Sequence, residues 1–125
     1  MRIADTRLVL PVIPGRPGAL YFTLFAGDKP VTLTAIEAGG IGRVELHRTV
    51  REGAASRMVA IGGPVAAPGA PLRFAPGGMH AMLIDVDPGI GPGDAVPLTF
   101  RIEPGAPIEY ETRAQAAGSE GHEGH

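Results

Sequence analysis

The chain has 125 residues, enough for one domain with a modest core, and 44% of them are hydrophobic. It carries 11 basic and 13 acidic residues, and no basic stripe occurs, which argues against nucleic-acid binding. Cysteine is absent, which excludes disulfides, thiolate metal sites and thiol catalysis. No apolar run reaches the roughly 18 residues that a membrane span needs. Asp5 and Arg7 interrupt the N-terminal region, so no signal peptide is expected there.

Short segments of alternating apolar and polar residues recur along the chain, as in half-buried β-strands. Glycine and proline, 19 and 13 residues, form turn signals between nearly all of these segments, and no helical pattern occurs. The sequence therefore predicts an all-β, antiparallel sandwich over residues 1–113, followed by a disordered tail over residues 114–125. The predicted strands cover residues 6–10, 19–25, 31–38, 42–50, 56–61, 71–74, 80–85, 96–103 and 108–112.

The residues with distinctive chemistry are histidines and methionines. His80 and Met82 lie two apart on a predicted strand, so both side chains project from one face. His47 alternates with apolar neighbours and is expected on the face away from them. If Glu52 and Gly53 form a two-residue turn, His47 faces Met58 directly across the hairpin, with Cβ atoms about 5 Å apart. The two His/Met pairs could then meet as one site with four ligands.

The ligand types select the metal. Thioether sulfur is soft and uncharged, so it binds Cu(I) well and binds zinc, magnesium or calcium poorly. Imidazole adds donor strength, and neither ligand type must lose a proton at neutral pH. A blue-copper electron-transfer site needs a cysteine thiolate, which this chain lacks. The pattern therefore predicts that Cu(I) is bound as cargo.

The spacing of these residues resembles a known signature. His47, Met58, His80 and Met82 reproduce the H-x10-M-x21-H-x-M motif of the PCu(A)C family of periplasmic copper chaperones. The surrounding segments are similar to the family as well, and the resemblance covers roughly residues 8 to 113. These segments are VELH ending at His47, APGG before His80, GDAVPLTF from Gly93 and PGALYFTL from Pro17.

The resemblance implies a cupredoxin-like Greek-key β-sandwich that binds Cu(I) and is not an enzyme. It implies a periplasmic location and delivery of copper to the Cu(A) subunit of cytochrome c oxidase, alongside a Sco-type thiol protein. Two features depart from the family pattern. Arg48 stands where many members have a methionine directly after the first histidine, and no signal peptide is evident. Arg48 leaves the four ligands in place, but a cation there could alter docking of a partner.

Several alternatives stay open. Met79, the strand neighbour of His80, should point away from the site and serve in packing. In the tail, His122 and His125 form a His-x-x-His pair that could bind Cu(II) or could be an ordinary solvated segment. The competing functions are a β-sandwich module that binds a protein or glycan, a periplasmic copper storage or resistance protein, and a copper oxidase. A ligand set rich in methionine, with no open coordination position, argues against the oxidase.

Overall fold

The computed structural model describes residues 1–76 and 78–117, and these fold into strands and turns without a helix. No helix in these two ranges has the length and apolar character needed to cross a membrane. The strands are β1 (Arg2–Val9), β2 (Gly18–Phe25), β3 (Val31–Ala38), β4 (Ile41–Glu52), β5 (Ala55–Ala60), β6 (Val65–Ala66), β7 (Leu72–Phe74), β8 (Met79–Val86), β9 (Ala95–Glu103) and β10 (Ile108–Gln115).

The all-β prediction is confirmed, and each of the nine predicted strands is present. The two-residue strand β6 was not predicted, because so short a segment shows no alternation. Strand β1 begins earlier than expected. Its pairing with β2 has an irregularity between Ala4 and Arg7, with Asp5 at φ 55°, and continues on both sides of it. Strand β10 runs to Gln115 and buries Ala114, so these two residues belong to the sheet and not to the predicted tail.

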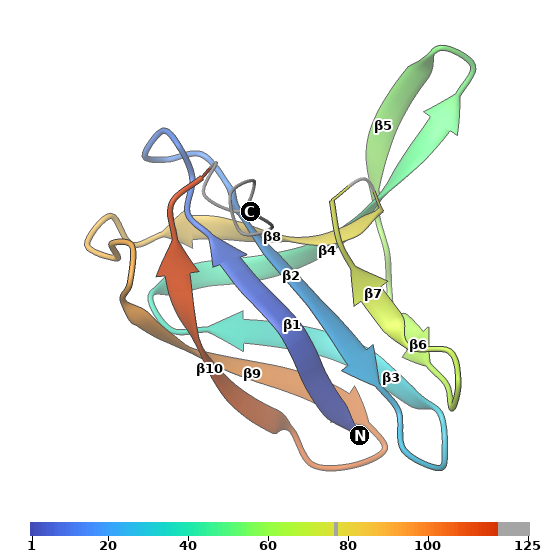
Figure 1. Ribbon diagram of the computed structural model, residues 1–125. Helices are drawn as coiled ribbons and strands as arrows, with labels where there is room; N and C mark the ends of the chain where they lie inside the picture. The colour runs from blue at the N-terminus through green and yellow to red at the C-terminus, as the bar shows by residue number, and fades with distance from the viewer. Residues whose placement is uncertain (77, 118–125) are drawn as a thin grey trace, which may run out of the picture.

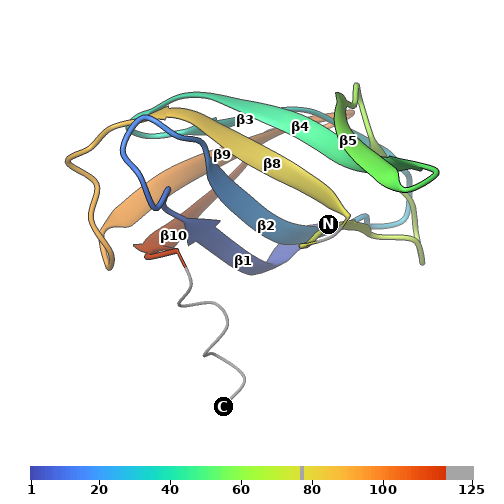
Figure 2. The same ribbon diagram turned by 90° about the horizontal axis from the view of Figure 1, so that it is seen from above.

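The strands form one continuous sheet that folds over on itself, in the order β5-β4-β8-β7-β2-β1-β10-β9-β3-β6. Most neighbours are antiparallel; the parallel exceptions are β1 with β10 and β7 with β8. In Figure 1, β1 and β2 cross in front of β3 and β9, and Figure 2 shows the same arrangement from above. The first layer, as named below, consists of strands β5, β4, β8, β7, β2 and β1. The second layer consists of strands β10, β9, β3 and β6.

Three phenylalanines join the two layers. Phe22 on β2 stacks on Phe74 of β7 with ring centroids 4.5 Å apart, and it meets Phe100 of β9 edge to face at 5.0 Å. All three rings are almost completely buried. Aromatic rings contribute much of the apolar area of a small core. The cluster therefore packs rings from the first layer against a ring from the second, among the buried aliphatic side chains of the core.

We expect Phe22→Ala to lower the free energy of unfolding by about 3–5 kcal/mol, because it removes the ring that contacts both other phenylalanines and leaves a cavity. Denaturant unfolding followed by circular dichroism measures this change. Tyr110→Ala is the matched control, since Tyr110 is 38% exposed on β10. Equal losses in the two variants would contradict the assigned role of the cluster.

Candidate metal centre

The pairing of β4 with β8 places two histidines side by side. His47 on β4 lies directly opposite His80 on β8, with ring centroids 6.3 Å apart and ring planes 26° from parallel. The register follows from the core. Ala81 and Leu83 of β8 are fully buried, and Leu46 of β4 packs against the same cluster. Because side chains alternate along a strand, both imidazoles must then project from the outer face of the first layer.

Met82 lies on the same outer face, next to His80. It is paired with Glu45 on one side and with Ala19 of β2 on the other. Met79, by contrast, packs against the hydrophobic core, as the sequence predicted. The alternation along β8 thus separates the two thioethers of that strand, with one on each side of the sheet.

Met58 reaches this face by a different register from the one predicted. The prediction paired His47 with Met58 across a turn at Glu52 and Gly53; in the structure Met58 pairs with Thr49, and His47 with Ala60. The prediction was wrong by two residues because the turn is formed one residue later. Gly53 has φ 64° and takes the first loop position, where a two-residue hairpin accepts positive φ. A shift of two preserves the face, so Met58 stays on the same side as His47.

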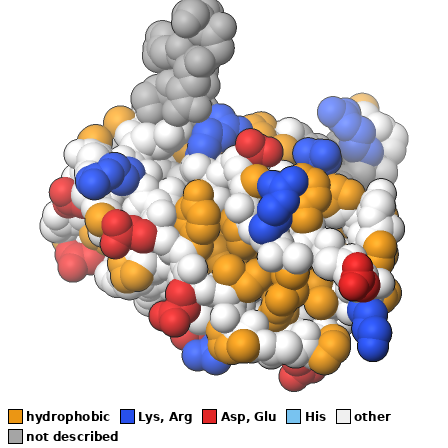
Figure 3. Space-filling model, turned by 60° about the horizontal axis from the view of Figure 1, so that its bottom comes forward, with side chains coloured by type: hydrophobic (Ala, Val, Ile, Leu, Met, Phe, Trp, Pro, Cys, Tyr) orange, Lys and Arg blue, Asp and Glu red, His pale blue; other side chains and the backbone are white. Residues whose placement is uncertain are grey.

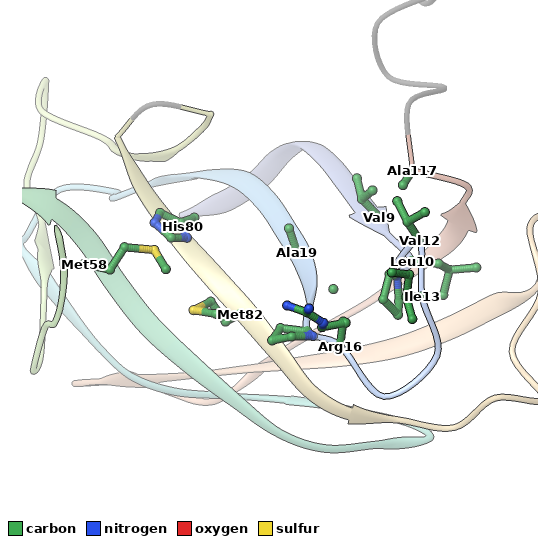
Figure 4. A pocket seen from close by; sticks show the side chains of 13 residues that line it. Val9, Leu10, Val12, Ile13, Arg16, Ala19, Met58, His80, Met82 and Ala117 are labelled. Atoms are coloured by element: carbon green, nitrogen blue, oxygen red, sulfur yellow. The ribbon is translucent and has the colours of Figure 1, made fainter. Parts of the chain in front are cut away.

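Three of the four candidate ligands line one open groove of about 620 Å³. Figure 4 shows Met58, His80 and Met82 directed into the same part of it, from strands β5 and β8. Met58 is 49% exposed, so its thioether is accessible to solvent. His47 stands beside the groove rather than in its lining, and its side chain is 17% exposed. The structure therefore brings three residues to a common space and stacks the fourth against His80.

A hydrogen-bond chain orients His47. Its Nε2 lies 3.1 Å from Oε1 of Glu45, and Nε of Arg43 donates to the other carboxylate oxygen at 2.6 Å. Nδ1 of His47 is buried and has no hydrogen-bond partner among the described residues. Since a carboxylate only accepts, the proton is expected on Nε2, which leaves the lone pair of Nδ1 free. A buried acceptor without a donor is the arrangement that a metal ion can satisfy.

The ionisation of the site favours uncharged imidazole at His80. Burial lowers the pKa of His80, and the nearby His47 lowers it further. The hydrogen bond from Arg43 lowers the pKa of Glu45, and the one from His47 adds to this effect. The carboxylate is therefore charged at neutral pH, while His80 keeps a free electron pair for a ligand.

The comparisons with known proteins agree with this architecture. The model of the LpqE-like lipoprotein family matches residues 1–114. This chain belongs to the LpqE-like family. Among solved structures, "Copper-bound PCuAC domain from PmoF2" is similar with a TM-score of 0.72 and 22% identity, covering 91% of both chains. "Solution structure of CuI-DR1885 from Deinococcus Radiodurans" has a TM-score of 0.67 and 19% identity, covering 93% of this chain and 78% of the other.

These structural likenesses establish the fold, so the LpqE-like chain has the PCuAC-domain architecture. The uncharacterized protein RP573 of Rickettsia prowazekii (strain Madrid E) is 33% identical over 84 residues. That alignment covers 66% of this chain and 46% of the relative, so the chain spans less than half the length of that relative.

The donor set of the LpqE-like chain fits a soft metal better than a hard one. In the part of the chain that the structure describes, no three His, Cys, Asp or Glu side chains form a cluster that could hold a metal ion. The groove instead offers the thioethers of Met58 and Met82 beside the imidazole of His80. Thioether donors favour Cu(I) over zinc, calcium and magnesium.

Sequence reasoning missed the contribution of Glu45 and Arg43. The sequence did contain a signal for them. Both residues lie an even number of positions from His47 on β4, so their side chains project from the same face of the strand. The predicted Cu(II) pair in the tail, His122 and His125, lies outside the described residues and stays a prediction.

The hydrogen bond to Glu45 gives a measurable prediction. Long-range ¹H–¹⁵N NMR at mildly alkaline pH should find the proton of the His47 ring on Nε2. In Glu45→Gln the preference should weaken, because a neutral amide also offers a donor to the ring. Glu37→Gln is the matched control, since Glu37 pairs with Arg101 on the second layer. A proton found on Nδ1 of His47 in the unaltered chain would contradict the proposed orientation.

Proposed function

We propose that this chain is a copper carrier that binds Cu(I) through His47, Met58, His80 and Met82 and passes it on by ligand exchange. The observation that carries the proposal is the meeting of Met58, His80 and Met82 at one solvent-open groove, with His47 stacked beside His80. Two imidazoles and two thioethers form an uncharged set suited to a soft monovalent ion. Two structural neighbours, the copper-bound PCuAC domain from PmoF2 and CuI-DR1885, support the choice of metal.

The shape of the site favours transfer over catalysis. Met58 is half exposed on an edge strand, so a recipient could approach the metal and displace this thioether first. A catalytic copper site needs an open coordination position and a substrate pocket, and a four-ligand set leaves no such position. The chain is accordingly proposed to be a carrier and not an enzyme.

The recipient is proposed from the resemblance to the PCu(A)C signature. On that basis copper goes to the Cu(A) subunit of cytochrome c oxidase, with a Sco-type protein as a partner. The lipoprotein family supports a location outside the cytoplasm, and the resemblance narrows this proposal to the periplasm. A thiol-free carrier suits an oxidising compartment, because it has no cysteine to oxidise.

Removal of single sulfur atoms tests the ligand set. Met82→Leu and Met58→Leu keep the side-chain volume nearly constant and should each weaken Cu(I) binding at least about tenfold, or about 1.4 kcal/mol. Met79→Leu is the matched control, because the same change on the core side of the same strand should leave the affinity unaltered. Competition with a Cu(I) chelator gives the affinities.

X-ray absorption on the loaded protein should count two sulfur and two nitrogen neighbours around copper, and one sulfur in Met82→Leu. The ligand set is refuted if Met79→Leu loses as much affinity as Met82→Leu. It is also refuted if both Met58→Leu and Met82→Leu bind copper as the unaltered chain does.

Copper titration separates a carrier from an interaction module whose His/Met cluster is incidental. Binding to the folded state alone should raise the free energy of unfolding by about 4 kcal/mol when free Cu(I) is about a thousand times its dissociation constant. The double variant His47→Ala with His80→Ala should abolish this gain while remaining folded, because both side chains lie outside the core cluster. A melting temperature that does not respond to Cu(I) in well-folded protein would favour the interaction module.

A further inference from the structure

An exposed apolar loop lies next to the candidate ligands. Val12 is 80% exposed and Ile13 is 58% exposed, and both line the same groove as Met58, His80 and Met82. The loop has a defined shape, since the amide of Arg16 donates to the carbonyl of Ile13 at 3.1 Å and Gly15 adopts φ 89°. Exposed apolar side chains gathered at one place mark contact surfaces more often than scattered ones do.

The fixed charge in the groove lining is positive. Among the described residues that line the groove, Arg16 is the only one with a permanent charge. The outer face of the first layer, which carries His47, His80, Met82 and Met58, is called the ligand face below. Arg51 lies near the end of β4, an even number of residues from His47, so its side chain projects from this face as well. Both guanidinium groups are exposed, and neither forms an ion pair within residues 1–76 and 78–117. Glu45, an acid on this face, is already paired with Arg43 and His47.

Several acidic residues lie away from the groove, although a hollow lined by Asp85 and Asp87 shares Val12 with it. Glu103, Glu109 and Glu111 lie on β9 and β10 of the second layer. Asp85 and Asp87 line a separate hollow on the other flank of the loop over residues 10–17. On the face in Figure 3, acidic, basic and apolar side chains are interspersed, and no histidine side chain is visible there. The ligand face is thus distinguished by its combination of apolar side chains, histidine and unpaired arginine.

We propose that this face, defined by Val12, Ile13, Arg16, Arg51 and Met58, docks an acidic protein that presents an apolar tip beside its own copper-binding groups. Apolar contact between the tip and Val12 and Ile13 supplies affinity, and carboxylates facing the two arginines supply orientation and a faster encounter. The proposal rests on the proposed function and names its partner by chemistry. A recipient docked here lies over Met58, so the copper would pass without crossing bulk solvent.

A peptide pair tests the docking without copper. The probes are the octapeptide EDGWLGDE and its uncharged counterpart QNGWLGNQ. The chain has no tryptophan, so the fluorescence of the peptide reports binding directly. We expect the acidic peptide to bind the copper-free protein at least about tenfold more tightly at low salt, and to lose this advantage near 0.5 M salt, where the Debye length is only a few ångströms.

Variants and methyl NMR locate the contact. The acidic peptide should shift the methyl resonances of Val12, Ile13 and Met58, and Arg16→Gln with Arg51→Gln should weaken its binding about tenfold. Lys29→Gln with Arg101→Gln is the matched control, because it removes the same charge from exposed positions away from the groove. Equal affinity for the two peptides, shifts confined to other faces, or equal losses in both double variants would overturn the proposal.

Sedimentation distinguishes a second copy of the chain as the occupant, since its second layer carries acids. A dimer that dissociates in Arg16→Gln with Arg51→Gln would replace the acidic partner and overturn the proposal as stated; a monomer at assay concentration supports it. Failure of copper binding is distinguishable from failure of docking. The peptide measurements use copper-free protein, and the methionine variants test the metal without any peptide.

Discussion

The antiparallel register between β4 and β8 is the constraint on which the site depends. It places His47 opposite His80 and Glu45 opposite Met82, while Ala81 and Leu83 fill the core beneath them. Because the period of a strand is two, a slip of one residue in either strand would turn the imidazole of that strand toward the core and its apolar side chains outward. The core therefore specifies the surface that carries the candidate ligands. The same burial that stabilises the sheet also keeps the two histidines adjacent.

Much of this arrangement could be predicted from alternation alone. The outward direction of His47, His80 and Met82, and the inward direction of Met79, follow from the parity of each residue relative to its apolar neighbours. The pairing of β4 with β8 could not be read in this way, since the two strands are separated in sequence by β5, β6 and β7. The spacing that resembles the PCu(A)C signature supplied what the local pattern could not, namely the prediction that the four residues form one site.

The pairing within the β4–β5 hairpin could not be predicted from alternation alone. Either turn, at residues 52–53 or at residues 53–54, keeps Met58 on the face of His47, and parity cannot choose between them. The structure has the turn at residues 53–54, because Gly53 adopts the positive φ that suits the first position of this loop. The outcome moves Met58 from beside His47 to beside Thr49. The error therefore changed the residue that lies opposite Met58 and left the face on which Met58 lies unchanged.

The four candidate ligands differ in how firmly the fold holds them. His80 and Met82 sit on β8, which is flanked by β4 and also pairs with β2 and β7, and His47 is fixed by Glu45. Met58 sits on β5, an edge strand that pairs with β4 and whose residues are all exposed or only partly buried. Local opening costs least where few apolar contacts are buried, so the hairpin is the element that can move without disturbing the core. The proposed carrier must bind copper tightly enough to hold it and still release it, and three anchored candidate ligands with a fourth on an edge hairpin would meet both requirements.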